Sequence, residues 1–190
     1  MILDDLKDYG NPRCKLQRLV RDGAYTQVIR GLYETNPRTP GYLLAGSIRG
    51  PSYLSFEYAL YRHDLIPEYI RLYTSATFGT GKVKRYETPF GRYRYRDTPS
   101  ETFYMGVETI EEDGYEYRIA SKEKAVCDEL YIMAPIRSRK GLEGFLYDDM
   151  RIEEEDILSL DRELIRKLSR GYHCTSVNTL RDYLDEEACR

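Results

Sequence analysis

The chain has 190 residues, 41% of them hydrophobic and 32% charged, with a formal net charge of −3. This length allows one large domain or two small ones, and no run approaches the roughly 20 apolar residues of a membrane span. The weak negative charge argues against a protein that coats nucleic acid everywhere, so any DNA binding must come from local basic patches.

The remaining composition points to a cytoplasmic protein. The acidic N-terminus lacks the apolar region of a signal peptide. The four cysteines contain no CxxC pair and are typical of free thiols in a reducing compartment: Cys14, Cys127, Cys174 and Cys189. Only His63 and His173 could add imidazole ligands, and they lack ligand spacing, so we expect no metal and no cofactor.

Residues 2–9 could form a thin lead-in helix, and residues 11–33 predict a second short helix followed by a tight hairpin. Asn11 can cap the second helix, Pro12 suits its first turn and Gly23 suits its C-terminal end. An apolar stripe falls at helical spacing: Leu16, Leu19 and Val20. The hairpin uses residues 25–29 and 32–33 as strands and Arg30-Gly31 as the turn.

This helix and hairpin are dense in basic side chains, with only Asp22 against them. A basic helix followed by a hairpin is the core of a winged helix-turn-helix, whose helix enters the DNA major groove. The predicted phosphate contacts are Arg13, Lys15 and Arg30. The predicted base contacts are Gln17, Arg18 and Arg21. The alternative is a packing unit whose basic side is merely solvated.

Residues 36–41 contain two prolines and a glycine and form the clearest break in the chain. We therefore predict a shortened winged helix-turn-helix-like module at residues 1–36 and a mixed α/β domain at residues 41–190. The fold class is α+β, with a mainly antiparallel sheet and C-terminal helices. We describe the module as shortened because a full winged helix-turn-helix usually has two helices before the recognition helix, whereas this sequence offers only the lead-in at residues 2–9.

The second domain begins with predicted helices at residues 42–48 and 56–64, the latter capped by Ser55. We expect His63 to be a packed or capping histidine. Further elements follow in order: a strand at 69–73, a loop at 75–81, strands at 103–110 and 115–119, a helix capped by Ser121, and helices from residue 151, one of them closed by Gly171. Residues 79–82 only faintly resemble a phosphate loop, and we reject that interpretation because most of the motif is missing.

A second basic region precedes the 103–110 strand and contains Lys82, Lys84, Arg85, Arg92, Arg94 and Arg96. Residues 92–96 alternate arginine with tyrosine, so a strand there places all three arginines on one face. We favour a half-buried strand with tyrosines inward and arginines in water. The alternative is a basic surface that contacts phosphates.

We do not expect this protein to be an enzyme. A restriction-type nuclease needs a carboxylate with a Glu-x-Lys motif to hold metal, and the chain has no Glu-x-Lys. Asp5-Leu6-Lys7 has no suitable upstream carboxylate. Cys174 follows His173 directly, but sequence neighbours point apart, so they make a poor nucleophile and base pair.

Four segments in order resemble the AbiEi antitoxins of type IV toxin–antitoxin (abortive infection) systems. They read RLVRDG at 18–23, VIRGLY at 28–33, YLSFEYAL at 53–60 and IASKEKAVCD at 119–128. The resemblance covers roughly residues 6–185. It implies an N-terminal winged helix-turn-helix that represses its own operon at inverted repeats, where two copies would bind double-stranded DNA. It also implies a C-terminal domain that counters a nucleotidyltransferase toxin. The alternative is an interaction module of the same family that no longer binds DNA.

Overall fold

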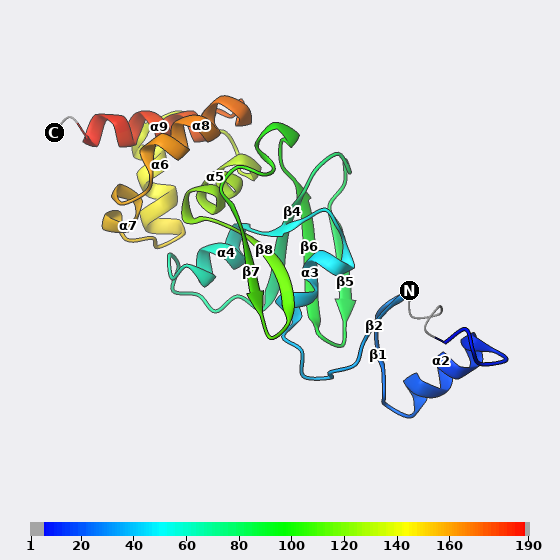
Figure 1. Cartoon of the computed structure of the whole chain (residues 1–190). Coiled ribbons are helices and arrows are strands. Elements are labelled where there is room, and N and C mark those ends of the chain that lie inside the picture. The colour runs from blue at the N-terminus through cyan, green and yellow to red at the C-terminus, as the bar shows by residue number, and fades with distance from the viewer. Residues whose placement is uncertain (1–5, 189–190) are drawn as a thin grey trace.

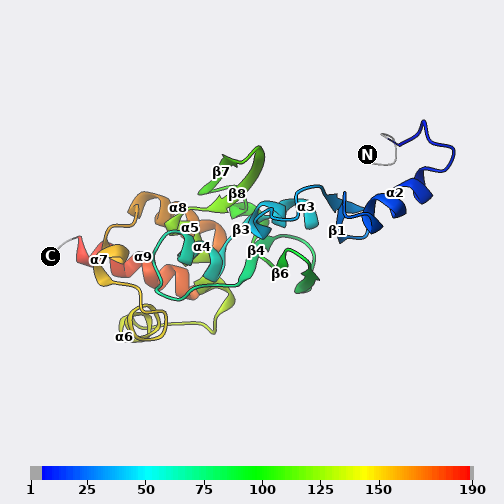
Figure 2. The ribbon, with the colours of Figure 1, turned by 90° about the horizontal axis from the view of Figure 1, so that it is seen from below.

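The structure is a computed structural model that describes residues 6–188. A small N-terminal module lies at one end of the molecule and the C-terminal helices at the other, with a mixed α and β body between them (Figures 1 and 2). Residues 35–40 join the module to the body without forming a helix or strand. Half of the predicted helix at residues 2–9 lies outside the described residues, as does Cys189, and residues 6–8 form a turn.

The module consists of α2 (Pro12–Arg21) and a hairpin of β1 (Thr26–Ile29) and β2 (Leu32–Glu34). The predicted cap is confirmed, because the Asn11 side chain accepts a hydrogen bond from the Cys14 amide at 3.1 Å. Gly23 has a φ of +77° and ends the helix as predicted. The sequence therefore predicted the helix, the hairpin that follows it and the glycine that ends the helix.

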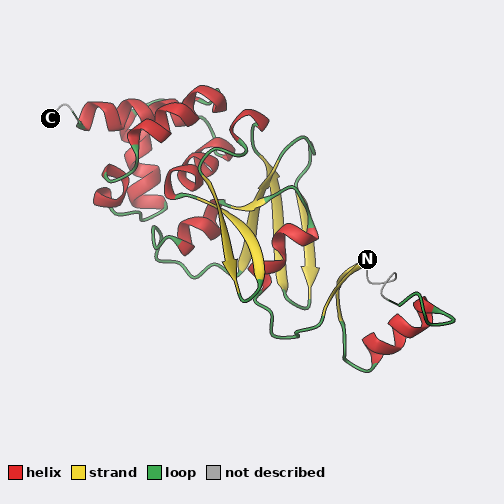
Figure 3. Cartoon of the chain, in the orientation of Figure 1, coloured by secondary structure: helices red, strands yellow, loops and turns green. Residues whose placement is uncertain are grey.

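The body contains one six-stranded sheet in the order β5-β6-β4-β3-β8-β7. Figure 3 shows this sheet in yellow with helices in red around it. Its strands are β3 (Tyr53–Leu54), β4 (Leu72–Thr77), β5 (Lys84–Thr88), β6 (Gly91–Asp97), β7 (Val107–Glu112) and β8 (Tyr115–Ala120). Three neighbouring pairs are antiparallel, but β3–β8 and β4–β6 are parallel, so the sheet is mixed. The parallel β4–β6 pair arises because β5 lies outside β6, at the edge of the sheet.

The predicted limits of two strands are wrong. β4 begins at Leu72, and Tyr69 lies in the preceding loop with 69% of its surface exposed. Residues 75–77, predicted as a loop, belong to β4 and are buried, because small side chains suit a strand covered on both faces. Residues 103–106 form turns before β7 begins at Val107.

One face of the sheet is covered by η1 (Gly41–Leu44) and α3 (Ala45–Ile48), which together form the predicted helix at 42–48. Tyrosines from β6 hold this cover in place. The Tyr93 hydroxyl donates to the Gly41 carbonyl at 2.9 Å, and the Tyr95 hydroxyl donates to the Ala45 carbonyl at 2.7 Å. Tyrosine is suited to this role because its ring fills the core while its hydroxyl reaches a backbone acceptor.

The opposite face carries α4 (Phe56–Arg62). The Thr74 hydroxyl of β4 accepts from the Tyr58 amide at 3.0 Å and donates to the Ser55 carbonyl at 2.6 Å. Ser55 occupies the N-cap position, but the prediction of a side-chain cap is wrong, because its hydroxyl is used elsewhere. His63 is a packed histidine as predicted, with Nε2 2.7 Å from the Ala120 carbonyl.

The remaining helices are α5 (Lys122–Ile132), α6 (Arg139–Glu143), a π-helical turn (Gly144–Asp149), α7 (Glu154–Leu158), α8 (Arg162–Tyr172) and α9 (Thr175–Glu187), with η2 (Ser100–Thr102) before β7. Ser121 caps α5 as predicted. α8 continues past Gly171 to Tyr172, whose buried ring packs in the core, so the predicted stop at Gly171 is wrong. None of the helices within residues 6–188 combines the length and apolarity needed to cross a bilayer.

Candidate functional site

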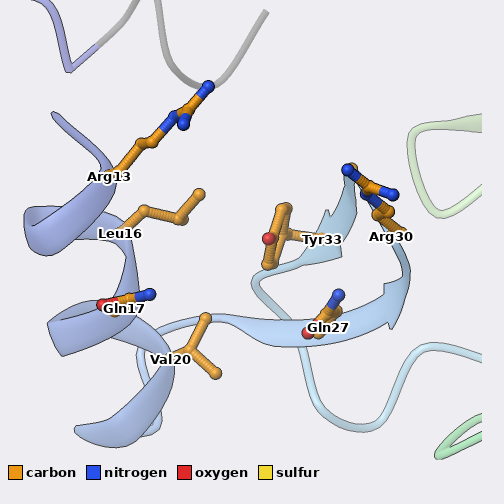
Figure 4. A pocket seen from close by; sticks show the side chains of 8 residues that line it. Arg13, Leu16, Gln17, Val20, Gln27, Arg30 and Tyr33 are labelled. Atoms are coloured by element: carbon orange, nitrogen blue, oxygen red, sulfur yellow. The ribbon is translucent and has the colours of Figure 1, made fainter.

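A hollow of about 450 Å³ lies between α2 and the β1–β2 hairpin (Figure 4). Leu16 and Val20 point from the helix toward the hairpin, and Tyr33 points back from β2 (Figure 4). Two of the three residues in the predicted apolar stripe of α2 therefore face the hairpin. Arg13, Gln17, Gln27, Arg30 and Gly31 complete the lining.

The predicted DNA contacts do not all gather on one surface. Arg13, Gln17 and Arg30 border the hollow, whereas Arg18 and Arg21 are exposed and do not line it. Arg21 lies 3.5 Å from the Asp22 carboxylate, its neighbour in sequence. Arg18 and Arg30 form no ion pair with any residue of the described range 6–188. Both arginines are exposed.

Lys15 occupies a different side of the helix. A helix turns about 100° per residue, which places Lys15 roughly opposite Arg13. Its ammonium lies 4.8 Å from the centre of the Tyr9 ring, and the residue is half-buried. The structure thus separates two predicted phosphate contacts, and whether either binds DNA stays a prediction.

The second basic region is divided between the two faces of the sheet. Tyr93 and Tyr95 are buried, as predicted. Lys84 pairs with Tyr95 across β5 and β6, and Arg85 pairs with Arg94, so the two basic residues of β5 point to opposite faces. Lys82 precedes β5 and is exposed, as is Arg92.

Two of the arginines are only partly exposed to water, which corrects the prediction that all three are solvated. Arg94 and Arg96 are half-buried on the sheet face that α4 covers. The Arg96 guanidinium lies 5.6 Å from the centre of the Phe56 ring. They share this region with two acidic residues, Glu57 of α4 and Glu129 of α5. The sequence alone could not predict this, because α4 and α5 are distant from β6 in the chain.

The acidic residues and Arg96 line a cavity of about 640 Å³, which we call the carboxylate cavity: Glu57, Gly81, Lys82, Val83, Arg96, Asp97, Glu129, Ile132 and Met133. Glu129 is only 6% exposed. Burial, and then the charge of Glu57, raise the pKa of Glu129 to about 8, although Arg96 and Arg94 oppose the shift.

The loop at residues 79–82 binds a carboxylate of the protein itself. The amides of Thr80 and Gly81 each donate to Asp97 Oδ2 at 2.7 Å, and the hydroxyls of Thr77 and Thr80 each donate to Oδ1 at 2.7 Å. Burial raises the pKa of Asp97, but these hydrogen bonds outweigh it and lower the pKa overall. The donors that could hold a phosphate are therefore already occupied.

Sequence reasoning missed a buried charge network, formed by Tyr53, Ser55, Lys124, Asp128 and Tyr172. The side chains of Lys124 and Asp128 are both 0% exposed, with Nζ 3.4 Å from Oδ1. Asp128 Oδ2 accepts from the Tyr53 hydroxyl at 2.9 Å and from the Ser55 hydroxyl at 2.5 Å. The Tyr172 hydroxyl donates to Oδ1, and Lys124 Nζ donates to that hydroxyl at 2.5 Å.

This network joins residues 53–60 and 119–128, two of the segments on which the family resemblance rests. Burial lowers the pKa of Lys124 despite the opposing charge of Asp128. Burial and Asp128 hold the pKa of Tyr53 and Tyr172 well above the ordinary value, so both hydroxyls stay protonated and donate. The available signal was a lysine and an aspartate four residues apart in an otherwise apolar helix turn. Because the network is sealed from solvent, it can join elements but cannot meet a substrate.

The buried network and the carboxylate cavity therefore belong to the body, and the exposed arginines of α2 and the hairpin to the module. Comparisons with known proteins assign no function to either part. No protein-family model matches the chain, and a search of curated proteins finds no match.

Proposed function

We propose that this protein binds double-stranded DNA through α2 and the β1–β2 hairpin. The observation that carries the proposal is the exposure of Arg18 and Arg21 on α2 and Arg30 at the hairpin tip, in a module at one end of the molecule (Figure 2). In a winged arrangement the helix reads the major groove and the hairpin touches the backbone or the minor groove. Exposed guanidinium groups suit both contacts.

The resemblance to AbiEi antitoxins supports a more specific role. We infer a cytoplasmic antitoxin that represses its own promoter at inverted repeats and counters a nucleotidyltransferase toxin. One module offers few phosphate contacts, so two copies on a repeated site would supply the affinity of a specific complex. In this proposal the protein is a binding protein and not an enzyme.

The predicted contacts set the expected size of the effects. Three phosphate contacts per module, from Arg13, Lys15 and Arg30, give a salt slope of about −2.7 for each bound copy, so the affinity of one copy should fall about 40-fold between 50 and 200 mM salt. Arg18 and Arg21 are each expected to contribute about 1–3 kcal/mol of base discrimination. Removing both should weaken specific binding by at least about 30-fold.

The test is an anisotropy titration with the DNA upstream of the gene and with a scrambled duplex, at both salt concentrations. Arg18→Ala/Arg21→Ala is compared with Arg118→Ala/Arg137→Ala, which removes the same charge from exposed positions of the body. Binding that prefers the upstream DNA and is lost only in the first double variant supports the proposal. Equal affinity for both duplexes, or equal loss in both variants, contradicts it.

A second candidate function is a protein-interaction module that no longer binds DNA. It is favoured by the open hollow, whose apolar side chains Leu16, Val20 and Tyr33 would suit a protein partner. Within residues 6–36 the structure also places only one helix before the hairpin. Absence of DNA binding, together with a partner protein that Val20→Asp releases, would establish this alternative.

A further inference from the structure

The carboxylate cavity lies in the body, where α4 and α5 meet the end of β6 and the loop before β5. It uses no residue of α2 or the hairpin, so it is independent of the proposed DNA contacts. Its acidic side chains come from two different helices: Glu57 in the first turn of α4 and Glu129 near the end of α5.

Both carboxylates are incompletely satisfied. The Oε2 atoms of Glu57 and Glu129 are buried, and neither has a hydrogen-bond partner among residues 6–188. Glu129 is more than nine-tenths buried. A buried acceptor without a partner costs about 1–3 kcal/mol, and more when it is charged. The cavity therefore presents acceptor oxygens that a ligand with N–H donors would satisfy.

The neighbouring arginines and lysine do not donate hydrogen bonds to these two Oε2 atoms. The Arg96 guanidinium packs on Phe56, and the buried Nε of Arg94 itself has no partner within the described chain. Lys82 lines the cavity but is an exposed residue. The third carboxylate, Asp97, is occupied by Thr80 and its neighbours, so it offers few free lone pairs to a ligand.

The rest of the lining is apolar and partly open to solvent. Met133 is 42% exposed and Val83 is 48% exposed, and both line the cavity with Ile132. Such a rim suits methylene groups, which lose contact with water when they pack against it. A bare metal ion would make no use of these side chains.

We propose that the carboxylate cavity binds an alkylguanidinium or alkylammonium group, with its N–H donors on Glu57 and Glu129 and its methylene stem against Val83 and Met133. A planar guanidinium donates two parallel hydrogen bonds to a carboxylate, which favours it over a simple ammonium. The group can come from a small free molecule or from a basic side chain of another protein, and the test separates these sources.

Binding of a cation should release a proton from the cavity. The charged groups that act on Glu129 are Glu57 of α4, Asp128 of α5, and Arg94 and Arg96 of β6. Together with burial they leave its pKa at about 8, so the acid is mostly protonated at pH 7 and mostly ionised at pH 9. Because a cation favours the ionised form, affinity should rise about tenfold between these pH values.

The experiment is isothermal titration calorimetry of the full chain at pH 7 and pH 9. The probes are agmatine, spermidine, an acetyl-Gly-Arg-Gly-amide peptide and magnesium chloride. We expect one site for agmatine or the peptide, about tenfold tighter at pH 9. Glu129→Gln should abolish the rise with pH and Glu57→Gln should weaken binding, whereas Glu116→Gln, an exposed control on β8, should change neither.

The outcomes separate the alternatives. Binding of agmatine assigns the cavity to a small free molecule, and binding of the peptide alone assigns it to a basic side chain of a protein partner. Absence of saturable binding at millimolar concentration overturns the proposal, as does unchanged binding in Glu129→Gln or a preference for magnesium. If Glu129→Gln fails to fold, the affinity of Glu57→Gln and the pH dependence of the wild type still test whether the cavity binds the cation. DNA titrations with the Arg18→Ala/Arg21→Ala variant remain a separate test, because those residues lie in the module.

Discussion

Replacing Lys124 by methionine should destabilise the protein strongly, although the new side chain is apolar and of similar length. The Lys124 ammonium is the cation of the charge network, and its side chain and that of Asp128 are both 0% exposed. Breaking a buried ion pair by removing one partner typically costs about 3–5 kcal/mol, because the remaining charge stays buried without its partner. Asp128 keeps hydrogen bonds from the hydroxyls of Tyr53, Ser55 and Tyr172. We therefore expect a loss near the lower limit, about 3 kcal/mol.

The chain contains a matched control for this change. Lys167 pairs with Glu163 at 2.9 Å, also four residues apart in a helix, but both side chains are exposed. Exposed pairs of this kind contribute about 0.3–0.5 kcal/mol. Lys167→Met should therefore alter stability little. The two variants carry the same substitution and remove the same charge, so their difference measures the effect of burial.

Urea denaturation at pH 7, followed by circular dichroism, measures both free energies of unfolding. The double variant Lys124→Met/Asp128→Asn removes both charges while an amide oxygen still accepts hydrogen bonds. It should be more stable than Lys124→Met alone, because no uncompensated charge remains. Losses for Lys124→Met and Lys167→Met that agree within about 0.5 kcal/mol would refute the reasoning.

Two further predictions concern the body. Gly41→Ala should cost about 1–3 kcal/mol in urea denaturation, because its Cβ would lie 2.2 Å from the Phe90 carbonyl oxygen, whereas Gly46→Ala meets nothing within 4 Å and should not destabilise. Asp97→Asn should cost about 1–3 kcal/mol at pH 7 by weakening the hydrogen bonds from Thr80 and Gly81. Because folding lowers the pKa of Asp97, its contribution is present above the unfolded value of 3.8 and is lost as the pH falls through the folded pKa. The difference between wild type and variant should therefore shrink in denaturations at acid pH, and a difference that is constant with pH would contradict this.

Local features of this protein were determined by the sequence alone. Asn11 caps α2, Ser121 caps α5, and Asp113-Gly114 forms the turn between β7 and β8 with positive φ at both residues. The alternation of residues 92–96 predicted which side chains are buried tyrosines. These features depend on hydrogen bonds and periodicity within a few residues, so the adjacent sequence is sufficient to specify them.

Tertiary structure decided the strand order and the surroundings of the charged groups. The parallel β3–β8 and β4–β6 pairs join segments that are not adjacent in the chain, and the sequence of one strand does not predict which strand it pairs with. Ser55 looked like a helix cap, but its hydroxyl donates to Asp128, which is 73 residues away in the chain. Arg94 and Arg96 looked solvated, but packing of α4 and α5 on the sheet places them beside Glu57 and Glu129. Such contacts follow from burial of apolar surface between distant segments, and a charge takes its environment from the elements that this packing brings together.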